Sequence, residues 1–295
     1  EGTYRITAEV PVQEGEYIEK NNQETFQLQV RDEHIRVLLV DSVPRWEYRY
    51  LRNALFRDPR VTVRTLLFNQ PGMETGKGAG YLDAFPASKD ELSAYDVVFI
   101  GDVGMGPNEL SKQQLQRLRG LVEIQGSGVV LLPGRRGGQV DLLSSPLKEL
   151  YPVVLNKKNK NGCRSSRPSH LNLTGKGSGH RLTMLADSSQ ANRDVWRWLP
   201  GFYWHAPVTK VKLGTQVLAV HESKSGEWGR LPLLVTRSYG NGKVLFMGID
   251  SAWRWRRGVE DKYHYRFWRQ VVRWMAHKRH VATKERIRLF FTPAH

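Results

Sequence analysis

Cysteine and long apolar runs are both scarce in this sequence. Cys163 is the only cysteine in the 295-residue chain, which excludes an intrachain disulfide and a zinc site built from cysteines. No apolar run approaches the roughly 18 residues that a membrane-spanning helix needs. The chain begins at Glu1 without a methionine or a signal-like apolar segment, so we interpret it as a mature protein or as part of a larger one. The histidines are dispersed without metal-ligand spacing, so we predict neither a metal site nor a cofactor.

Acidic residues are also under-represented. The chain has 29 Asp and Glu against 45 Lys and Arg, a formal net charge of +16. A field of this sign could attract nucleic acid, an anionic polysaccharide or an anionic membrane surface. The basic residues are scattered, however, and the one local cluster, between Lys157 and Arg167, lies in a stretch rich in Gly, Ser and Asn that we expect to be a solvated loop. Nucleic-acid binding would rest on charge alone and is disfavoured.

What the sequence does contain is a regular alternation of strands and helices. Short apolar runs typical of buried strands occur at 35–41, 61–68, 95–102 and 129–132. Between them lie amphipathic segments at 45–57 and 111–125, the second with Ser111 as its N-cap. In the first, Trp46 and Leu51 share a face that we expect to pack on the sheet. The alternation predicts an α/β fold with a doubly wound, mainly parallel sheet.

The second half of the chain predicts an antiparallel extension of that sheet. Three further strands are expected at 217–221, 231–237 and 243–249. The last two are separated by Gly240-Asn241-Gly242, in which Asn-Gly is a strong signal for a hairpin turn. A final amphipathic helix is expected at 263–277.

The two ends of the chain have the patterns of separate β modules. Residues 2–10 alternate like a half-buried strand, and residues 26–30 alternate again after a polar link. Together they are similar to the last hairpin of an immunoglobulin-like sandwich. Residues 287–291 look like the opening strand of another module. We therefore predict three parts: a hairpin of an immunoglobulin-like module at 1–34, a central domain at 35–278, and a linker with a first strand at 279–295.

The segment 126–138 has the layout of a nucleophile elbow but carries no nucleophile. An apolar strand at 129–132 is followed by Gly134, Gly137 and Gly138, which permit a sharp strand-to-helix turn. In class I glutamine amidotransferases, a cysteine at the apex of such a turn attacks the amide of glutamine. Here the apex carries Arg135 and Arg136. A guanidinium stays protonated at physiological pH and cannot be a nucleophile.

The most distinctive blocks of the chain are Val37–Asp41, Pro44–Leu51, Tyr95–Val98, Leu131–Gly134, Trp198–Gly201 and Gly248–Arg256. Together they resemble the glutamine amidotransferase-like domain of large bacterial envelope proteins, over roughly residues 35–278. The resemblance implies the flavodoxin-like fold of the class I amidotransferase superfamily and an extracytoplasmic, membrane-anchored parent protein. It also implies immunoglobulin-like or von Willebrand A-type domains of the same polypeptide as partners.

The catalytic residues of that superfamily do not carry over. The His and Glu expected after the last core strand should fall near 248–256, where the chain has Asp250 and Ser251 and no His-x-Glu pair. Cys163 lies about 28 residues beyond the elbow, and no positioned partner for it is evident. Two hypotheses remain open: an inert module that binds a ligand or partner, and an active hydrolase or amidotransferase that uses unusual groups. The second hypothesis would make the chain similar in layout to the trehalose-utilisation-like branch of the same fold, which also lacks the nucleophile.

The best candidate site is the crevice at the carboxyl ends of the parallel strands, where open α/β sheets bind ligands. An anionic or sugar ligand is the expected occupant. The alternative is that the same groups form a network of salt bridges and cation–π contacts that only braces the loops. The aromatic residues between 196 and 205 are expected to pack the sheet edge. The candidate residues are Asp41, Arg45, Trp46, Asp102, Arg135, Arg136, Asp250, Trp253, Arg254 and Arg256.

Overall fold

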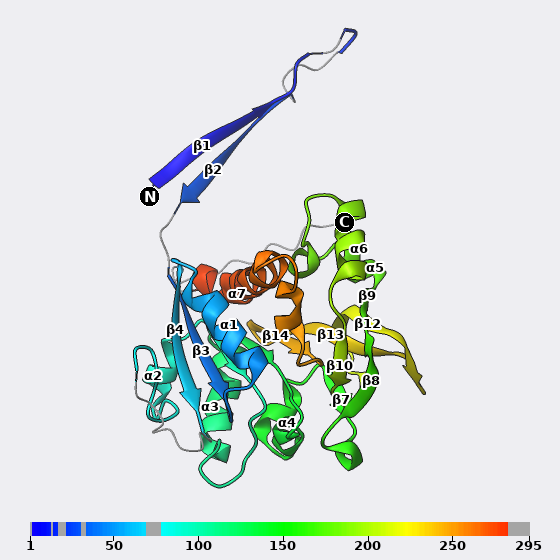
Figure 1. The fold of residues 1–295 in the computed structure, drawn as a ribbon. Helices are drawn as coiled ribbons and strands as arrows, with labels where there is room; N and C mark the ends of the chain where they lie inside the picture. The colour runs from blue at the N-terminus through cyan, green and yellow to red at the C-terminus, as the bar shows by residue number, and fades with distance from the viewer. Residues whose placement is uncertain (1, 13, 17–21, 31–33, 69–77, 283–295) are drawn as a thin grey trace. The chain divides into compact units, whose positions relative to one another are not determined.

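The computed structural model describes residues 2–12, 14–16, 22–30, 34–68 and 78–282, and its contacts divide the chain into two units, 1–34 and 35–295 (Figure 1). The first unit is a hairpin in which β1 (Gly2–Glu9) pairs antiparallel with β2 (Gln23–Val30). Tyr4, Ile6 and Phe26 are exposed on it, because a two-stranded ribbon by itself buries neither face. Its assignment to an immunoglobulin-like module stays a prediction.

The second unit is built on an eight-stranded sheet with the order β4-β3-β5-β6-β14-β13-β12-β9. The parallel part consists of β3 (Ile35–Asp41), β4 (Val61–Leu67), β5 (Val97–Ile100), β6 (Gly128–Leu131) and β14 (Gly242–Met247). The antiparallel part consists of β13 (Gly229–Tyr239), β12 (Thr215–Gly226) and β9 (Leu171–Leu173). The predicted α/β fold, with a parallel first half and an antiparallel extension, is confirmed.

The central strands are adjacent and buried, as their apolar runs predict. β3 pairs with β5, and β5 pairs with β6, both in parallel. Their side chains from Val37 to Val40, from Val97 to Ile100 and from Val129 to Leu132 are almost inaccessible to solvent. Strands buried on both faces in this way hold their carboxyl ends in fixed positions, which matters for the site described below.

Helices cover both faces of the sheet. α1 (Trp46–Phe56) and α7 (Lys262–Ala282) contact each other over one face (Figure 1). α2 (Lys89–Ser93) and α3 (Lys112–Glu123) also contact each other. They lie on the opposite face of the sheet, because the connections between parallel strands are right-handed. Ser111 is the N-cap of α3 and forms a capping box with Gln114, as the sequence predicts. Shorter helices are α4 (Gly138–Asp141), α5 (Gly175–Ser178) and α6 (Ser189–Trp198).

Two small strand pairs flank the sheet. β7 (Val153–Leu155) pairs with β11 (Val208–Val211), and β8 (Cys163–Ser169) pairs with β10 (Phe202–His205). The segment expected to be a solvated loop between Lys157 and Arg167 is therefore a strand from Cys163 onward, because β10 supplies its backbone partners. Of the aromatic residues between 196 and 205, Trp196, Phe202 and Trp204 are buried, as predicted. Trp198, at the end of α6, is 85% exposed, so the prediction is wrong for that residue.

Two details of the helices differ from the sequence prediction. Trp46 is 56% exposed, because the buried face of α1 is formed by Tyr48, Leu51 and Leu55 instead. Helix α7 continues to Ala282, so the predicted end of the central domain at residue 278 falls within a helix. The predicted strand at 287–291 lies outside the described residues.

Candidate functional site

The carboxyl ends of β3 and β5 lie at the point where the strand order changes direction, the usual position of a ligand crevice in an open α/β sheet. Asp41 ends β3 and Asp102 follows β5. The structure brings these two predicted residues together: Oδ1 of Asp41 accepts a hydrogen bond from the backbone amide of Asp102 at 3.1 Å. The hydroxyl of Ser42 donates to the carbonyl oxygen of Asp102 at 2.7 Å. The backbone amide and the carbonyl group of Asp102 are thus both hydrogen-bonded to the end of β3.

Arg45 crosses the same edge of the sheet. Its Nε donates to Oδ2 of Asp41 at 2.8 Å. Its two terminal nitrogens donate to the carbonyl oxygens of Pro133, at 3.2 Å, and Leu132, at 2.6 Å, just after β6. Burial raises the pKa of Asp41, and the Arg45 charge opposes that effect. Arg45 therefore ties the end of β3 to the end of β6, and we assign it a bracing role.

The turn after β6 is held in place by the buried carboxylate of Asp102. Oδ2 of Asp102 accepts from the backbone amide of Arg136 at 2.6 Å, and Oδ1 accepts from that of Gly138 at 2.8 Å. Gly134 passes so close that a Cβ there would lie 2.6 Å from Oδ2 of Asp102. Gly137 has a φ of 74°, in the left-handed region that favours glycine. The sharp turn that the glycines predict is therefore present. Two of its backbone amides donate to a carboxylate of the protein itself.

The side chains of Arg135 and Arg136 point away from that buried network, and each is 47% exposed. Nε of Arg135 donates to Oδ2 of Asp250 at 3.0 Å. A terminal nitrogen of Arg136 lies 3.8 Å from Oε1 of Glu109, beyond hydrogen-bond distance. The carboxyl edge therefore presents two half-exposed guanidinium groups from one turn, each beside one carboxylate.

Trp253, Arg254 and Arg256, which follow β14 on the 3-10 helix η6 (Ala252–Arg256), belong to a stack of rings and guanidinium groups. The guanidinium of Arg254 lies between the rings of Tyr203, at 4.8 Å, and Trp253, at 4.7 Å. Trp253 stacks on Tyr50 at 6.0 Å, and Arg256 covers Tyr50 at 4.1 Å.

Trp46 extends this stack against both Trp253 and Tyr50, at 5.7 and 5.9 Å. Arg256 also pairs with Asp261. The structure thus brings these predicted residues together in the arrangement expected of a brace between α1 and η6, and Arg135 and Arg136 lie outside it.

Glu47 is a buried residue of this region that the sequence reasoning missed. It is 2% exposed, and its Oε2 accepts from the backbone amide of Trp253 at 3.4 Å. Its Oε1 has no hydrogen-bond partner in the described part of the chain. Burial raises the pKa of Glu47 to about 8. One signal could have found it: Glu47 precedes the buried Leu51 by four residues and so shares the inward face of α1.

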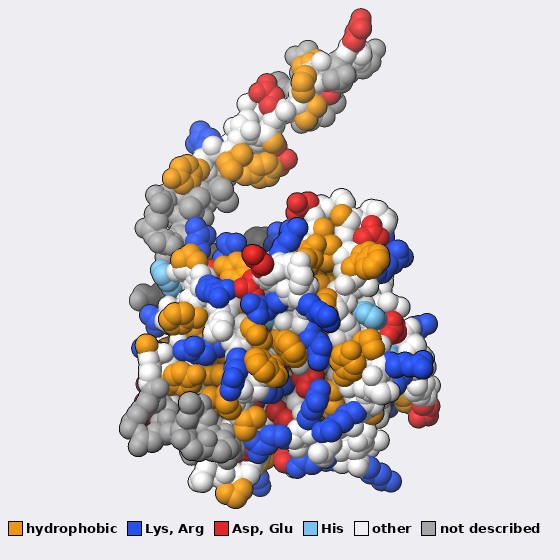
Figure 2. All heavy atoms as spheres, viewed as in Figure 1, with side chains coloured by type: hydrophobic (Ala, Val, Ile, Leu, Met, Phe, Trp, Pro, Cys, Tyr) orange, Lys and Arg blue, Asp and Glu red, His pale blue; other side chains and the backbone are white. Residues whose placement is uncertain are grey.

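Other groups that the sequence singled out lie elsewhere. Cys163 begins β8, opposite His205 on β10, and its sulfur accepts from the side-chain amide of Asn159 at 3.2 Å. Among the residues that the structure describes, no group of three or more His, Cys, Asp or Glu side chains is placed to hold a metal ion. Basic side chains are spread over the face seen in Figure 2, between apolar ones, with few acidic neighbours. On this face the basic charge is therefore distributed, as the sequence predicts.

No protein-family model and no curated protein matches this chain. Its structure is similar to that of the cytoplasmic protein STM1381 of Salmonella typhimurium LT2, with a TM-score of 0.55 and 17% identity over 92% of this chain and 96% of that one. It is also similar to the cytoplasmic protein STM3548 of Salmonella typhimurium, with a TM-score of 0.55, 16% identity and the same coverage. At these identities the likeness shows a shared fold and carries no information on activity.

The descriptions of those two proteins as cytoplasmic contradict the extracytoplasmic, membrane-anchored placement that the family resemblance implies. That prediction is wrong by this comparison, because it depended on the parent proteins of the resembled family and on no residue of this chain. In the part of the chain that the structure describes, no helix combines the length and the apolar character needed to cross a bilayer.

Proposed function

We propose that residues 35–278 form a glutamine amidotransferase-like module of flavodoxin-like fold that does not hydrolyse glutamine and that binds a carboxylate-bearing ligand at its carboxyl edge. The observation that carries the proposal is the position of Asp102, whose carboxylate takes the backbone amides of Arg136 and Gly138 in the elbow turn. The same turn leaves the side chains of Arg135 and Arg136 half-exposed.

The strand order supports the flavodoxin-like part of the proposal. The five parallel strands follow the order β4-β3-β5-β6-β14. Numbered by their sequence within the sheet, this is 2-1-3-4-5, the order of flavodoxin-like proteins. The elbow follows the fourth of these strands.

The chemistry of the turn supports the loss of glutaminase activity. Acyl transfer from an amide needs a nucleophile and hydrogen-bond donors aimed at the oxyanion that forms. The turn supplies guanidinium groups where the nucleophile would be, and Asp102 occupies two of its backbone donors. An oxyanion would also meet the negative charge of Asp102 at this position.

The exposed arginines support an anionic ligand. A planar guanidinium binds a carboxylate through paired hydrogen bonds, and two such groups on one turn match a ligand with several acceptor oxygens. Asp250 accepts a hydrogen bond from Arg135, Glu109 lies 3.8 Å from Arg136, and both arginine side chains stay 47% exposed. A sugar acid satisfies both the anionic and the sugar expectation of the sequence analysis.

One observation favours a second candidate function, a hydrolase that uses non-standard groups. Glu47 is a buried carboxyl group whose pKa of about 8 lies in the range useful for general acid–base catalysis. If this candidate is correct, Glu47→Gln abolishes an ammonia-releasing activity on glutamine that the wild-type protein shows.

Isothermal titration with D-glucuronate, and with D-glucose as its uncharged counterpart, tests the proposed function. We expect wild-type protein to bind glucuronate and not glucose. Arg135→Ala and Arg136→Ala each weaken glucuronate binding, and Arg164→Ala, which removes an exposed arginine on β8, leaves it unchanged. Equal binding of both sugars, or equal binding by all variants, would refute the proposed ligand class.

A further inference from the structure

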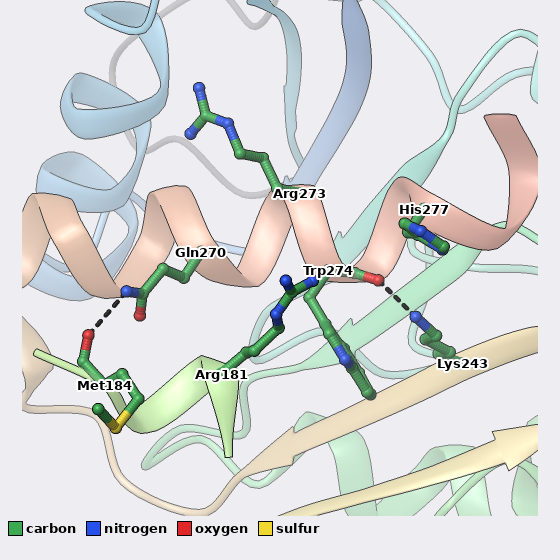
Figure 3. Close-up of a pocket in the computed structure, with 7 residues that line it drawn as sticks. All are labelled: Arg181, Met184, Lys243, Gln270, Arg273, Trp274 and His277. Carbon is green, nitrogen blue, oxygen red and sulfur yellow. Dashed lines mark hydrogen bonds between the residues drawn. The ribbon is translucent and has the colours of Figure 1, made fainter. Parts of the chain in front are cut away.

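A cavity lies away from the elbow, between α7, the 3-10 helix η5 (Arg181–Thr183) and the start of β14 (Figure 3). Its volume is about 500 Å³, which is within the range of small-molecule sites. Lys243 lines it and pairs in the sheet with Gly128, the first residue of β6. The cavity is therefore near the amino ends of the parallel strands, whereas Arg135 and Arg136 follow a carboxyl end.

The indole of Trp274 forms a fixed apolar wall of this cavity. Nζ of Lys243 lies 4.1 Å from the ring centroid and donates to the carbonyl oxygen of Trp274 at 2.7 Å. The ring of His180 meets the indole edge-on at 5.3 Å. Met184 adds a flexible thioether to the lining. An aromatic ligand ring could therefore pack here without first having to order the wall.

Gln270 lines the cavity and carries a hydrogen-bond acceptor that no residue described by the structure satisfies. Its Nε2 donates to the carbonyl oxygen of Met184 at 2.7 Å, as the dashed line in Figure 3 shows, and this bond fixes which way the amide points. Its Oε1 is buried and has no hydrogen-bond partner in the described part of the chain. A buried carbonyl oxygen without a donor costs stability, so a ligand that brings an N–H group gains by supplying one.

The charged groups of the lining are all basic. Arg181 is exposed at the start of η5 and reaches toward Trp274 (Figure 3). It makes no ion pair with any residue that the structure describes. Arg273, by contrast, points to the other side of α7, where it pairs with Asp58 at 3.1 Å. Lys243 adds to the positive potential, so the ligand should carry an anionic group near Arg181.

We propose that this cavity binds a small heteroaromatic phosphate, the class to which nucleoside monophosphates belong. The ring lies against Trp274 and Met184, a ring N–H or amino group donates to Oε1 of Gln270, and the phosphate meets Arg181. Trp274 and Gln270 come from α7 and Arg181 comes from η5, and a plain anion or a plain apolar molecule meets only one of the three requirements. The proposal does not depend on the function proposed for the carboxyl edge.

Isothermal titration of the full chain with AMP, adenosine and inorganic phosphate tests the proposal. We expect AMP to bind more tightly than either of its parts. Arg181→Ala should weaken AMP binding about tenfold or more, and Gln270→Met, which removes the acceptor at similar size, should weaken AMP binding and leave phosphate binding unchanged. Arg164→Ala serves as the matched control and should bind AMP as the wild-type protein does, and Arg136→Ala reports whether AMP binds at the elbow instead. The melting temperature of each variant checks that it is folded.

Four results would overturn the proposal. The first is no binding of AMP at millimolar concentration by folded wild-type protein. The second is phosphate binding as tight as AMP binding, which would mean a simple anion site. The third is AMP binding that Arg181→Ala and Gln270→Met leave unchanged, which would place the nucleotide elsewhere on the basic surface. Loss of AMP binding in Arg136→Ala alone would likewise move the site to the elbow.

Discussion

The carboxylate of Asp102 accepts a hydrogen bond from the backbone amide of Arg136 at 2.6 Å. The contact joins the residue that follows β5 to the turn that follows β6, and Gly138 supplies a second amide to the same carboxylate. The turn after β6 is therefore stabilised by an internal carboxylate. The arginines at its apex are therefore held in place by the backbone and remain exposed at their side chains.

The Asp102 contact should make a large contribution to stability. We expect Asp102→Ala to lower the free energy of unfolding by about 2 to 4 kcal/mol, because two buried amides lose a charged acceptor. Urea unfolding followed by circular dichroism measures the change. Asp194→Ala, which removes a carboxylate that is 45% exposed, is the matched control and should cost well under about 1 kcal/mol. Equal effects of the two substitutions would show that Asp102 does not hold the turn.

Glu47 should make stability depend on pH. The pKa of this carboxyl group is about 8 in the folded protein, against 4.5 as its ordinary value. Between these values the folded state keeps a proton that the unfolded state has released, so the free energy of unfolding falls as pH rises through this window. Glu47→Gln removes this contribution.

Urea midpoints at about pH 5 and about pH 9 measure the Glu47 effect, and the wild-type protein should lose stability relative to Glu47→Gln between them. Buried His264, whose pKa burial lowers to about 3, acts in the opposite direction in both proteins and cancels in the difference. Glu149→Gln, which changes an exposed carboxyl group, is the control, and its urea midpoints should change with pH as those of the wild-type protein do. A constant difference between wild type and Glu47→Gln would contradict the assignment.

The melting temperatures of Arg254→Ala and Arg136→Ala should distinguish a bracing residue from a binding residue. Arg254 lies between the rings of Tyr203 and Trp253, so Arg254→Ala should cost about 1 to 2 kcal/mol and lower the melting temperature by a few degrees. Arg136→Ala should leave the melting temperature nearly unchanged, because its side chain makes one long ion pair in the described structure. Differential scanning calorimetry of both variants decides the point. A larger loss in Arg136→Ala than in Arg254→Ala would reverse the two roles.

The fold could be predicted from the sequence because its signals are local. The runs that form β3, β5 and β6 are apolar almost without interruption, and the predicted Asn241-Gly242 signal falls at the turn between β13 and β14. The strand at Cys163–Ser169 was missed, because its residues are polar and become a strand only through pairing with β10.

The sequence predicts where the candidate site lies, but not which of its residues brace the fold and which present exposed side chains. The sequence places Asp41, Asp102 and Arg136 at neighbouring strand ends. It cannot show that Asp102 accepts from the backbone of Arg136 while the Arg136 side chain turns outward, because that choice depends on distances of a few ångströms across the sheet. Trp46 shows the same limit: its helical spacing indicates burial, and the structure leaves it 56% exposed.

The most direct test of the binding function is a calorimetric titration of D-glucuronate into Arg135→Ala/Arg136→Ala protein, compared with wild type. The double variant keeps the Asp102 contacts, which use backbone amides, and should therefore stay folded with a nearly unchanged melting temperature. We expect measurable heat of binding for the wild-type protein and none for the double variant. Equal binding by the two proteins, with both folded, would contradict it.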